Sequence, residues 1–261
     1  MTTTLALFGE HIDQSYSPTF HQHFAKQFDI EIDYQKITVT QETFTDAWKT
    51  FVKNGGKGAN VTMPCKNQAF QLCTSTTEHA KQAESVNTIR IDDGGFWFGD
   101  STDGVGFIED LVFYHQQELH AKKILILGAG GAASSILYSI LEQKPHSVLV
   151  ANRTLARAET LAKRYAKISI CDFMHIPTDK FDVVINAAAD LPLAALRVIF
   201  APKAIAYDLR YTPQALDFLQ WSSLHGAEKT FDGYGMLLEQ AAAAFSVWFN
   251  EKPTTNALRK F

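Results

Sequence analysis

The feature that most constrains the fold is a glycine-rich turn between a buried strand and a helix. Residues 123–127 form a continuous apolar run of the kind found inside parallel sheets. The pattern Gly128-x-Gly130-x-x-Ala133 follows at once and opens an apolar helix that we predict to end near Glu142. A strand, a glycine turn and a helix in this order predict a doubly wound α/β domain, whose turn binds the pyrophosphate of a dinucleotide.

The two glycines have separate physical tasks in this interpretation. Gly128 permits the tight turn, and Gly130 lets the backbone approach a pyrophosphate. The helix that follows offers unpaired N–H groups and the positive end of its dipole. The alternative, a tight turn without a ligand, is less well supported because both the strand and the helix are present.

The end of the second strand indicates which dinucleotide is bound. An acid about 20 residues beyond the loop would bind the ribose hydroxyl of NAD. This chain has Asn152-Arg153-Thr154 there, with Arg157 one turn further. Two guanidinium groups and no carboxylate favour the 2′-phosphate of NADP, although the arginines could also form a solvated helix face.

Strand-like and helix-like segments alternate along the whole chain, which predicts a parallel sheet with helices on both faces. We expect a hairpin around Asp92-Asp93-Gly94, and a helix with Ser17 as N-cap and Pro18 at its first position. Further strands are predicted at 5–8, 32–39, 147–151, 168–171, 181–185 and 204–207, with one ending at 60–62, and further helices at 42–53, 155–165 and 236–249 and from Pro64 onward.

Composition excludes several classes of function. The 261 residues carry a net charge of −4, which argues against a nucleic-acid binder. The start of the chain lacks the pattern of a signal peptide, and no apolar run has membrane-spanning length, so we expect a cytoplasmic protein. The three cysteines lack metal-ligand spacing and are typical of free thiols, and we expect no metal.

Polar residues in the first hundred positions are candidates for chemistry. Reduction of a ketone by hydride leaves an alkoxide, so a proton donor is required. Lys66 lies at the start of a helix, where the dipole disfavours a cation, but alone it could be a surface residue. Asp103, taken alone, is better explained as a helix N-cap. Asn87 lies in an apolar strand and Gln240 on an apolar helix stripe, so both need hydrogen-bond partners.

The order of several short motifs resembles the shikimate dehydrogenase family over nearly the full length of the chain. Each motif alone is weak, whereas their joint order is specific. The matching segments are Ser15-Tyr16-Ser17-Pro18, residues 58–66 (Gly-Ala-Asn-Val-Thr-Met-Pro-Cys-Lys), Val86-Asn87-Thr88, Thr102-Asp103-Gly104, Gly128-Ala129-Gly130-Gly131-Ala132, Asn152-Arg153-Thr154 and Asp232-Gly233-Tyr234-Gly235-Met236.

This resemblance implies an α/β fold of two domains. A discontinuous α/β domain of residues 1–101 and 236–261 would bind substrate, and a Rossmann-type parallel sheet in residues 102–235 would bind NADP(H). It implies reversible NADPH-dependent reduction of 3-dehydroshikimate to shikimate, a step toward chorismate and the aromatic amino acids. We expect a monomer or a homodimer with a small-molecule substrate, and no nucleic-acid or membrane partner.

The resemblance also implies a role for each matched residue. Lys66 and Asp103 would be the acid–base pair beside the reacting carbon and would also contact the substrate. The remaining substrate-binding residues would be Ser15, Ser17, Thr62, Asn87, Tyr211 and Gln240. The cofactor-binding residues would be Gly128, Ala129, Gly130, Gly131, Ala132, Asn152, Arg153, Thr154, Arg157, Leu209, Gly233 and Met236.

The chain departs from the family pattern in four places, one of which is a short region before Thr212-Pro213. Gln14 precedes Ser15 where the family usually has His and Ser, and Ser101 stands where the family has Asn. The segment Asn186-Ala187-Ala188-Ala189-Asp190 replaces Asn-Ala-Thr-Ser-Ser-Gly and a longer loop. This last change affects the expected loop contacts with the cofactor and leaves the Lys66–Asp103 pair untouched.

Two other functions remain open at this point. One is a broader quinate/shikimate dehydrogenase that accepts NAD, against which the Asn152-Arg153-Thr154 segment argues. The other is a non-catalytic regulator that binds NADPH on the same fold, since a fold alone does not determine activity. A decayed site should have lost Lys66 or Asp103, and the chain keeps both.

Overall fold

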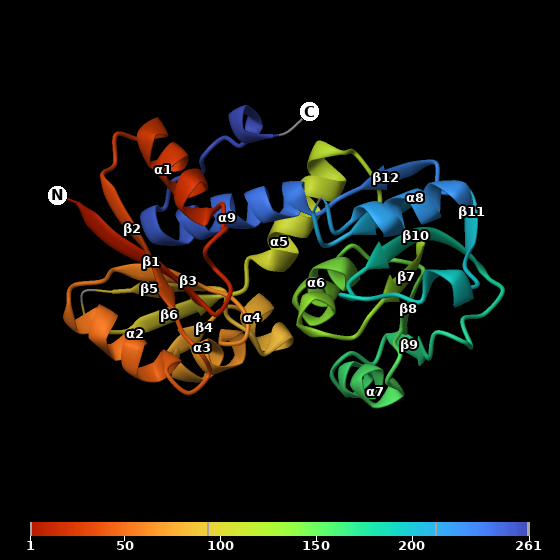
Figure 1. The fold of residues 1–261 in the computed structure, drawn as a ribbon, viewed down its shortest axis with the longest axis horizontal. Helices are drawn as coiled ribbons and strands as arrows, with labels where there is room; N and C mark the ends of the chain where they lie inside the picture. The colour runs from red at the N-terminus through yellow and green to blue at the C-terminus, as the bar shows by residue number, and fades with distance from the viewer. Residues whose placement is uncertain (1, 93, 212, 260–261) are drawn as a thin grey trace. The chain divides into compact units, whose positions relative to one another are not determined.

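A computed structural model describes residues 2–92, 94–211 and 213–259. The chain divides into two compact units (Figure 1). The first is discontinuous and contains Met1–Phe107 and Leu237–Phe261, and the second contains Ile108–Met236. Each unit has its own sheet of six strands within the described residues.

The first unit is a mixed sheet with the strand order β2-β1-β3-β5-β6-β4. Strand β1 runs parallel to β2 and β3, and β5 runs antiparallel to β3 and β6. The strands are β1 (Thr3–Gly9), β2 (Ile32–Thr38), β3 (Gly58–Val61), β4 (Ser75–Thr76), β5 (Thr88–Ile91) and β6 (Trp97–Asp100). The helices are α1 (Ser17–Gln27), α2 (Phe44–Lys53), α3 (Lys66–Leu72), α4 (Glu78–Ala83), α5 (Asp103–Ile108), α9 (Tyr234–Phe249) and a 3₁₀ turn at Asn256–Leu258, of which α5 and α9 continue into the second unit.

Strand β1 is buried on both faces, which explains its unbroken apolar sequence. Phe8 points toward α2 and meets the ring of Trp48 at a centroid distance of 5.7 Å. Leu5 and Leu7 point to the opposite face, where Trp248 of α9 packs against them. On that second face α1 and α9 lie side by side (Figure 1), and the sheet is therefore covered by helices on both sides.

The second unit is an all-parallel sheet with the strand order β12-β11-β10-β7-β8-β9. Numbered from β7, this is the 3-2-1-4-5-6 order of a Rossmann domain, which confirms the predicted fold class. The elements are a π-helical turn (Glu109–Tyr114), β7 (Lys123–Leu127), α6 (Gly131–Glu142), β8 (Ser147–Ala151), α7 (Leu155–Arg164), β9 (Ile168–Cys171), β10 (Lys180–Asn186), a 3₁₀ turn (Leu193–Ala195), β11 (Ile199–Asp208), α8 (Leu216–Leu224) and β12 (Lys229–Phe231).

The carboxyl ends of three neighbouring strands meet at one edge of this sheet. Leu127 of β7 pairs with Asn186 of β10, which in turn pairs with Asp208 of β11. The strand order reverses between β7 and β10, and open α/β sheets bind ligands at such a switch point. The glycine turn follows β7 directly, so it lies at this point of the sheet.

Several local predictions were wrong or incomplete. Ser17 is not an N-cap, because α1 begins at Ser17 itself and Tyr16 stands before it without a side-chain capping bond. Asp103 is likewise the first helical residue of α5 and not its cap. The helix expected from Pro64 begins two positions later, at Lys66.

The hairpin of β5 and β6 is confirmed, although Asp93 at its turn lies outside the described residues. Other elements were not predicted at all: β4, α4, the π-helical turn, α8 and β12.

Candidate active site

Lys66 and Asp103, the predicted acid–base pair, lie together in the first unit. Each is the first residue of a short helix, Lys66 of α3 and Asp103 of α5. Lys66 Nζ lies 2.6 Å from Asp103 Oδ2, and the side chains keep exposed fractions of 20% and 11%. An ammonium group that is mostly withdrawn from water but still reachable can transfer a proton to a bound ligand.

Asn87 fixes the carboxylate of this pair. Its side chain is buried, and its Nδ2 donates to Asp103 Oδ1 at 2.8 Å and to Thr102 Oγ1 at 3.0 Å. Its Oδ1 accepts from the Thr102 backbone N–H at 3.0 Å and from Thr88 Oγ1 at 2.9 Å. The buried Asn87 amide therefore has the hydrogen-bond partners that a polar group in an apolar strand requires. Because Asn87 holds one oxygen of Asp103, the other is left to Lys66.

Gln240 of α9 joins the same group of side chains. Its Oε1 accepts from Asn87 Nδ2 at 3.3 Å and from Thr102 Oγ1 at 3.4 Å, and its Nε2 donates to the Leu237 carbonyl at 2.9 Å. The inward orientation predicted from its helical stripe agrees with these contacts. A residue far along the chain therefore reaches the Asn87 amide, because α9 belongs to the first unit.

The two serines lie at the other end of a buried chain of hydrogen bonds. Ser15 Oγ accepts from the Ser17 backbone N–H at 3.2 Å and donates to Ser17 Oγ at 3.1 Å. Ser17 bonds to the hydroxyl of Tyr34, which donates to Asn60 Oδ1 at 2.7 Å. Asn60 Nδ2 then donates to Thr88 Oγ1 at 3.2 Å. The serines and the Lys66–Asp103 pair are thus connected by one buried polar network.

His21 also belongs to this network and is neutral. Its Nε2 lies 3.0 Å from Asn60 Oδ1, and burial lowers the pKa of the ring to about 3. Asn60 uses its Nδ2 to donate elsewhere, so its Oδ1 can only accept, and His21 must carry its proton on Nε2. No described group bonds to Nδ1, so a second proton there would have no acceptor.

Sequence reasoning missed several members of this network: His21, Tyr34, Asn60, Thr88 and Thr102. The signal for Asn60 was present, because it is a polar amide inside the apolar strand Gly58–Val61, as Asn87 is in its own strand. Thr102 belongs to the matched motif Thr102-Asp103-Gly104, but no role was predicted for its side chain. Nothing in the sequence pattern brings His21 and Tyr34 together, since that contact depends on α1 packing over β2.

Two further residues, Thr62 and Tyr211, were predicted to bind the substrate. Thr62 follows β3 and is half-buried, and its carbonyl accepts from the Cys65 N–H just before α3. Tyr211 belongs to the second unit, three residues beyond the end of β11. Their assignment to substrate stays a prediction.

The glycine turn of the second unit has room for a pyrophosphate. Gly128 has a φ of +111°, and a Cβ there would come within 2.9 Å of the Ala187 carbonyl carbon and the Ala188 nitrogen. A Cβ at Gly130, by contrast, would meet no described atom within 4 Å. Gly130 is the N-cap of α6, and no described side chain caps that helix. Open space before uncapped N–H groups fits the phosphates of a dinucleotide.

The end of β8 completes this side of the site. Asn152 Oδ1 accepts from the Ala129 N–H at 3.1 Å, and Asn152 Nδ2 donates to the Thr154 carbonyl at 2.7 Å, which ties the glycine turn to the next loop. Arg153 and Arg157 are exposed, and the first turn of α7 holds no acidic residue. The site can therefore accept an additional phosphate at the ribose.

The remaining predicted cofactor residues lie beyond β11 and β12. Gly233 donates its N–H to the Arg210 carbonyl at 2.8 Å, and a Cβ on Gly233 would overlap the Leu209 carbonyl. Glycine is therefore required for this close approach. Met236 is buried, and its backbone N–H bonds to the hydroxyl of Tyr207.

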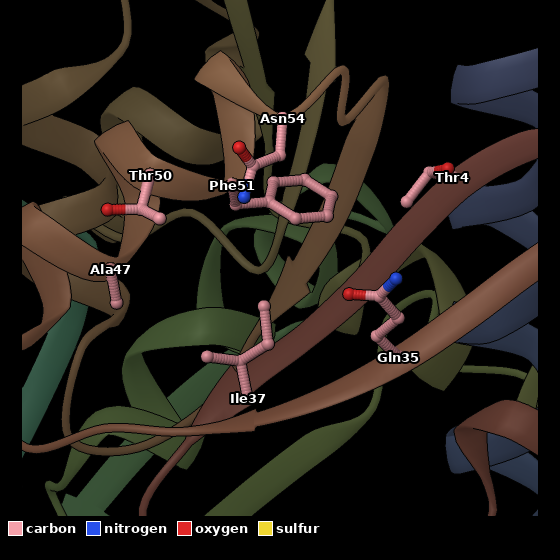
Figure 2. A pocket seen from close by; sticks show the side chains of 7 residues that line it. All are labelled: Thr4, Gln35, Ile37, Ala47, Thr50, Phe51 and Asn54. Atoms are coloured by element: carbon pink, nitrogen blue, oxygen red, sulfur yellow. The ribbon is translucent and has the colours of Figure 1, made fainter.

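A separate pocket lies on the first unit between α2 and the strands β1 and β2. Figure 2 shows side chains from β1, β2 and α2 around it, among them Gln35 and Phe51. None of the predicted site residues is among the described residues that line it. In the described parts of the chain, no group of three metal-ligating side chains occurs, and no helix is long and apolar enough to cross a membrane.

Three family models match consecutive parts of the chain. They describe the shikimate dehydrogenase substrate binding domain at residues 7–89, shikimate/quinate 5-dehydrogenase at residues 110–195, and the shikimate 5′-dehydrogenase C-terminal domain at residues 233–260.

Individual proteins are similar over the full length. The shikimate dehydrogenase (NADP(+)) of Chromobacterium violaceum is 39% identical, and the alignment covers 100% of this chain and 99% of that one. Among solved structures, an Ael1 enzyme from Pseudomonas putida has a TM-score of 0.88 with 31% identity and coverage of 98% and 96%. Shikimate 5-dehydrogenase from Thermus thermophilus, in complex with NADP(H) and shikimate, has a TM-score of 0.86 with 26% identity and coverage of 98% and 97%.

Proposed function

This chain belongs to the shikimate dehydrogenase family, and we propose that it carries out the family's reaction with Lys66 and Asp103 as its acid–base pair. It is an NADP-dependent oxidoreductase that reduces 3-dehydroshikimate to shikimate reversibly. The observation that supports the proposed roles most directly is the 2.6 Å contact between Lys66 Nζ and Asp103 Oδ2, in which Asn87 holds the second carboxylate oxygen.

In the proposed mechanism, NADPH bound at the glycine turn would be the source of the hydride that the carbon of the ring ketone accepts. Lys66 donates a proton from Nζ to the ketone oxygen as it becomes an alkoxide. Asp103 orients Nζ and balances its charge before the transfer, and Asn87 keeps Asp103 in one rotamer through the 2.8 Å bond to Oδ1. In the reverse direction, neutral Lys66 takes the proton from the alcohol.

Substrate recognition is assigned to polar groups around this pair. Ser15 and Ser17 would bind the carboxylate, since their hydroxyls lie within 3.1 Å of each other and both can turn toward an anion. Asn87 and Gln240 would bind ring hydroxyls, and Thr62 and Tyr211 would complete the site. The assignment of substrate to the first unit and of NADP(H) to the second follows from these roles. A cytoplasmic location and a monomeric or homodimeric state are part of the same proposal.

The first turn of α7 holds no acidic residue, which argues against the alternative of a broader quinate/shikimate dehydrogenase that uses NAD. The non-catalytic regulator is disfavoured by the intact Lys66–Asp103 contact, which such a protein has no need to keep.

The deciding experiment follows NADPH absorbance in the purified protein when 3-dehydroshikimate is added, with quinate plus NAD as a second pair of reactants. We expect rapid oxidation of NADPH with the first pair and at most slow turnover with the second. A folded protein that binds NADPH but turns over neither pair would overturn the proposed activity in favour of the regulator.

A further inference from the structure

An ion pair with a buried carboxylate lies at the carboxyl end of β11, outside the residues assigned to the cofactor. Asp208 is fully buried, and the guanidinium of Arg210 donates two bonds to it, Nη2 to Oδ2 at 2.8 Å and Nε to Oδ1 at 3.1 Å. Asp208 also accepts from the Arg210 backbone N–H at 2.9 Å and from Asn186 Nδ2 at 2.8 Å. Both oxygens of the carboxylate are thus paired within the fold, which is how a buried charge is tolerated.

The third arm of Arg210 reaches a different segment. Its Nη1 donates to the Ala189 carbonyl at 2.8 Å. The other end of that segment is held by Asn186, whose Oδ1 accepts from the Ala188 N–H at 2.9 Å. Asn186 and Arg210 are both bonded to Asp208, so the turn from 186 to 189 is fixed at both ends to one buried carboxylate.

This turn is the backbone that lies against the glycine turn. The Ala187 N–H donates to the Leu127 carbonyl at 2.8 Å, and the hypothetical Cβ of Gly128 would come within 3.0 Å of the Ala187 carbonyl oxygen. The segment presents Ala187, Ala188 and Ala189, whose side chains have no polar atoms. Any polar contact that it makes with a ligand must therefore come from its backbone, and the position of that backbone decides whether the contact is made.

We propose that Arg210 is a positioning residue for the dinucleotide, which holds the alanine turn beside Gly128 through its bond to the Ala189 carbonyl. The inference rests on the proposed binding of NADPH at the glycine turn. Arg210 does this without contributing to the NADP preference, which is assigned to Arg153 and Arg157. The guanidinium stays about one third exposed, with a side-chain exposure of 31%.

Arg210→Lys is the most informative variant, because it keeps a cation beside Asp208 but lacks the planar guanidinium, whose separate nitrogens reach the carboxylate and the Ala189 carbonyl together. A second variant, Asp208→Asn with Arg210→Met, removes both charges together and so avoids an unpaired buried carboxylate. Arg197→Ala is the matched control, since Arg197 lies in the same unit and also bonds to backbone carbonyls, those of Ala194 and Leu196.

The measurements are the Kd of NADPH by calorimetry, the KM values for NADPH and for the ketone substrate, and thermal unfolding. We expect both Arg210 variants to raise the Kd and KM for NADPH about ten-fold, as for one lost charge-assisted hydrogen bond. The KM for the ketone substrate and the NADP/NAD ratio should stay within about two-fold of normal, since neither depends on the alanine turn. Arg197→Ala should change none of these values.

Folded Arg210 variants with a normal Kd for NADPH would overturn the proposal, and so would an equal loss of affinity for both substrates. If the unmodified protein failed to bind NADPH at all, the result would contradict the proposed function instead. Failure of the Arg210 proposal and failure of the proposed function are therefore distinguishable.

Discussion

At the scale of single residues, the site works because each buried polar atom of the Lys66–Asp103 pair has a defined partner. Asn87 divides the two oxygens of Asp103 between itself and Lys66, so the ammonium has one orientation toward a ligand. Such a network is coupled, because removing one member leaves another unpaired in a region of low dielectric constant. Mutations within it are therefore expected to be non-additive.

Lys66→Met tests the proton donor. It nearly keeps the length of the side chain and removes the charge, so the fold and NADPH affinity should stay nearly normal. We expect kcat to fall by about 10²–10⁴, the usual contribution of one acid–base group. Substrate affinity should change less, because proton transfer is a transition-state interaction. Steady-state kinetics and calorimetry measure the two effects.

The matched variants are Asp103→Asn and the double mutant. Since the pair acts as a unit, the double mutant should be little slower than the slower single mutant. Additive losses would mean that the two residues act independently. A Lys66→Met protein within a few-fold of normal kcat, with chemistry rate-limiting, would remove Lys66 from the mechanism.

His21 predicts a pH dependence of stability. Burial lowers its pKa from the usual 6.5 to about 3, so the unfolded chain binds a proton on this ring between those values and the native chain does not. Its stabilising contribution is complete above pH 6.5 and is lost as the pH falls toward 3, at up to about 1.4 kcal/mol per pH unit. His21→Phe keeps a ring beside Tyr34 and removes the titration.

Urea unfolding at pH values from about 7 to about 4.5, inside the window between the two pKa values, measures the effect. The His21→Phe variant should show a shallower decline in its free energy of unfolding than the normal chain, whatever its absolute stability. Equal slopes in the His21 variant and the normal chain would show that the ring is protonated in the native state or does not titrate.

At the scale of secondary-structure elements, the sequence predicted long and regular segments well. Strand β7 and α6 end where the apolar runs end, because burial on both faces of a parallel sheet leaves a clear pattern. The missed strands are short, β4 with two residues and β12 with three. Their formation depends on a neighbouring strand that is already in place, which no local pattern reveals.

Capping was also mispredicted at this scale. Ser17 and Asp103 have the residue types of N-caps, but each is the first helical residue and turns its side chain into the polar network. Residue type predicted the place of each near a helix start, and tertiary hydrogen bonds decided which task the side chain performs. Ser17→Ala should therefore remove a hydrogen bond of the network and not a helix cap.

The start of α7 predicts the cofactor preference. Arg153 and Arg157 are exposed beside the end of β8, with no acid in the first helical turn. Charge-assisted hydrogen bonds contribute about 1.5–3 kcal/mol each, so two would favour NADP over NAD by roughly two to four powers of ten. Replacing both by Ala should erase most of that preference. The ratio of kcat/KM for the two cofactors measures it, and equal efficiency in the normal chain would contradict the assignment.

At the scale of the whole molecule, the discontinuous first unit is the main consequence of the topology. One face of its sheet is fully packed only when α9 covers β1, where Trp248 packs on Leu5 and Leu7. Trp248 also donates its Nε1–H to the Ile89 carbonyl at 2.9 Å. Gln240 reaches Asn87 on the same helix. The sequence indicated such an arrangement only through family resemblance, since no local pattern tells which strand a distant helix will cover.

Truncation after Met236 tests this dependence. The second unit keeps all of its residues in the truncated chain, so we expect residues 108–236 to resist limited proteolysis as they do in the full chain. Residues 1–107 should be cleaved more readily than in the full chain, because one face of their sheet keeps α1 but loses α9. Mass spectrometry of the fragments identifies the cut sites. Equal resistance of residues 1–107 in both chains would show that α9 is dispensable for that unit.

The same topology sets an order of events at the ribosome. Domains generally fold as units during synthesis, with the N-terminal one first. In this chain the residues from Leu237 onward emerge last, after every residue of the second unit has been translated. The nascent chain can therefore finish its dinucleotide half while one apolar face of its earlier half still lacks α9. During translation, we expect a chaperone to bind the apolar surface around Leu5 and Leu7 that Trp248 later covers.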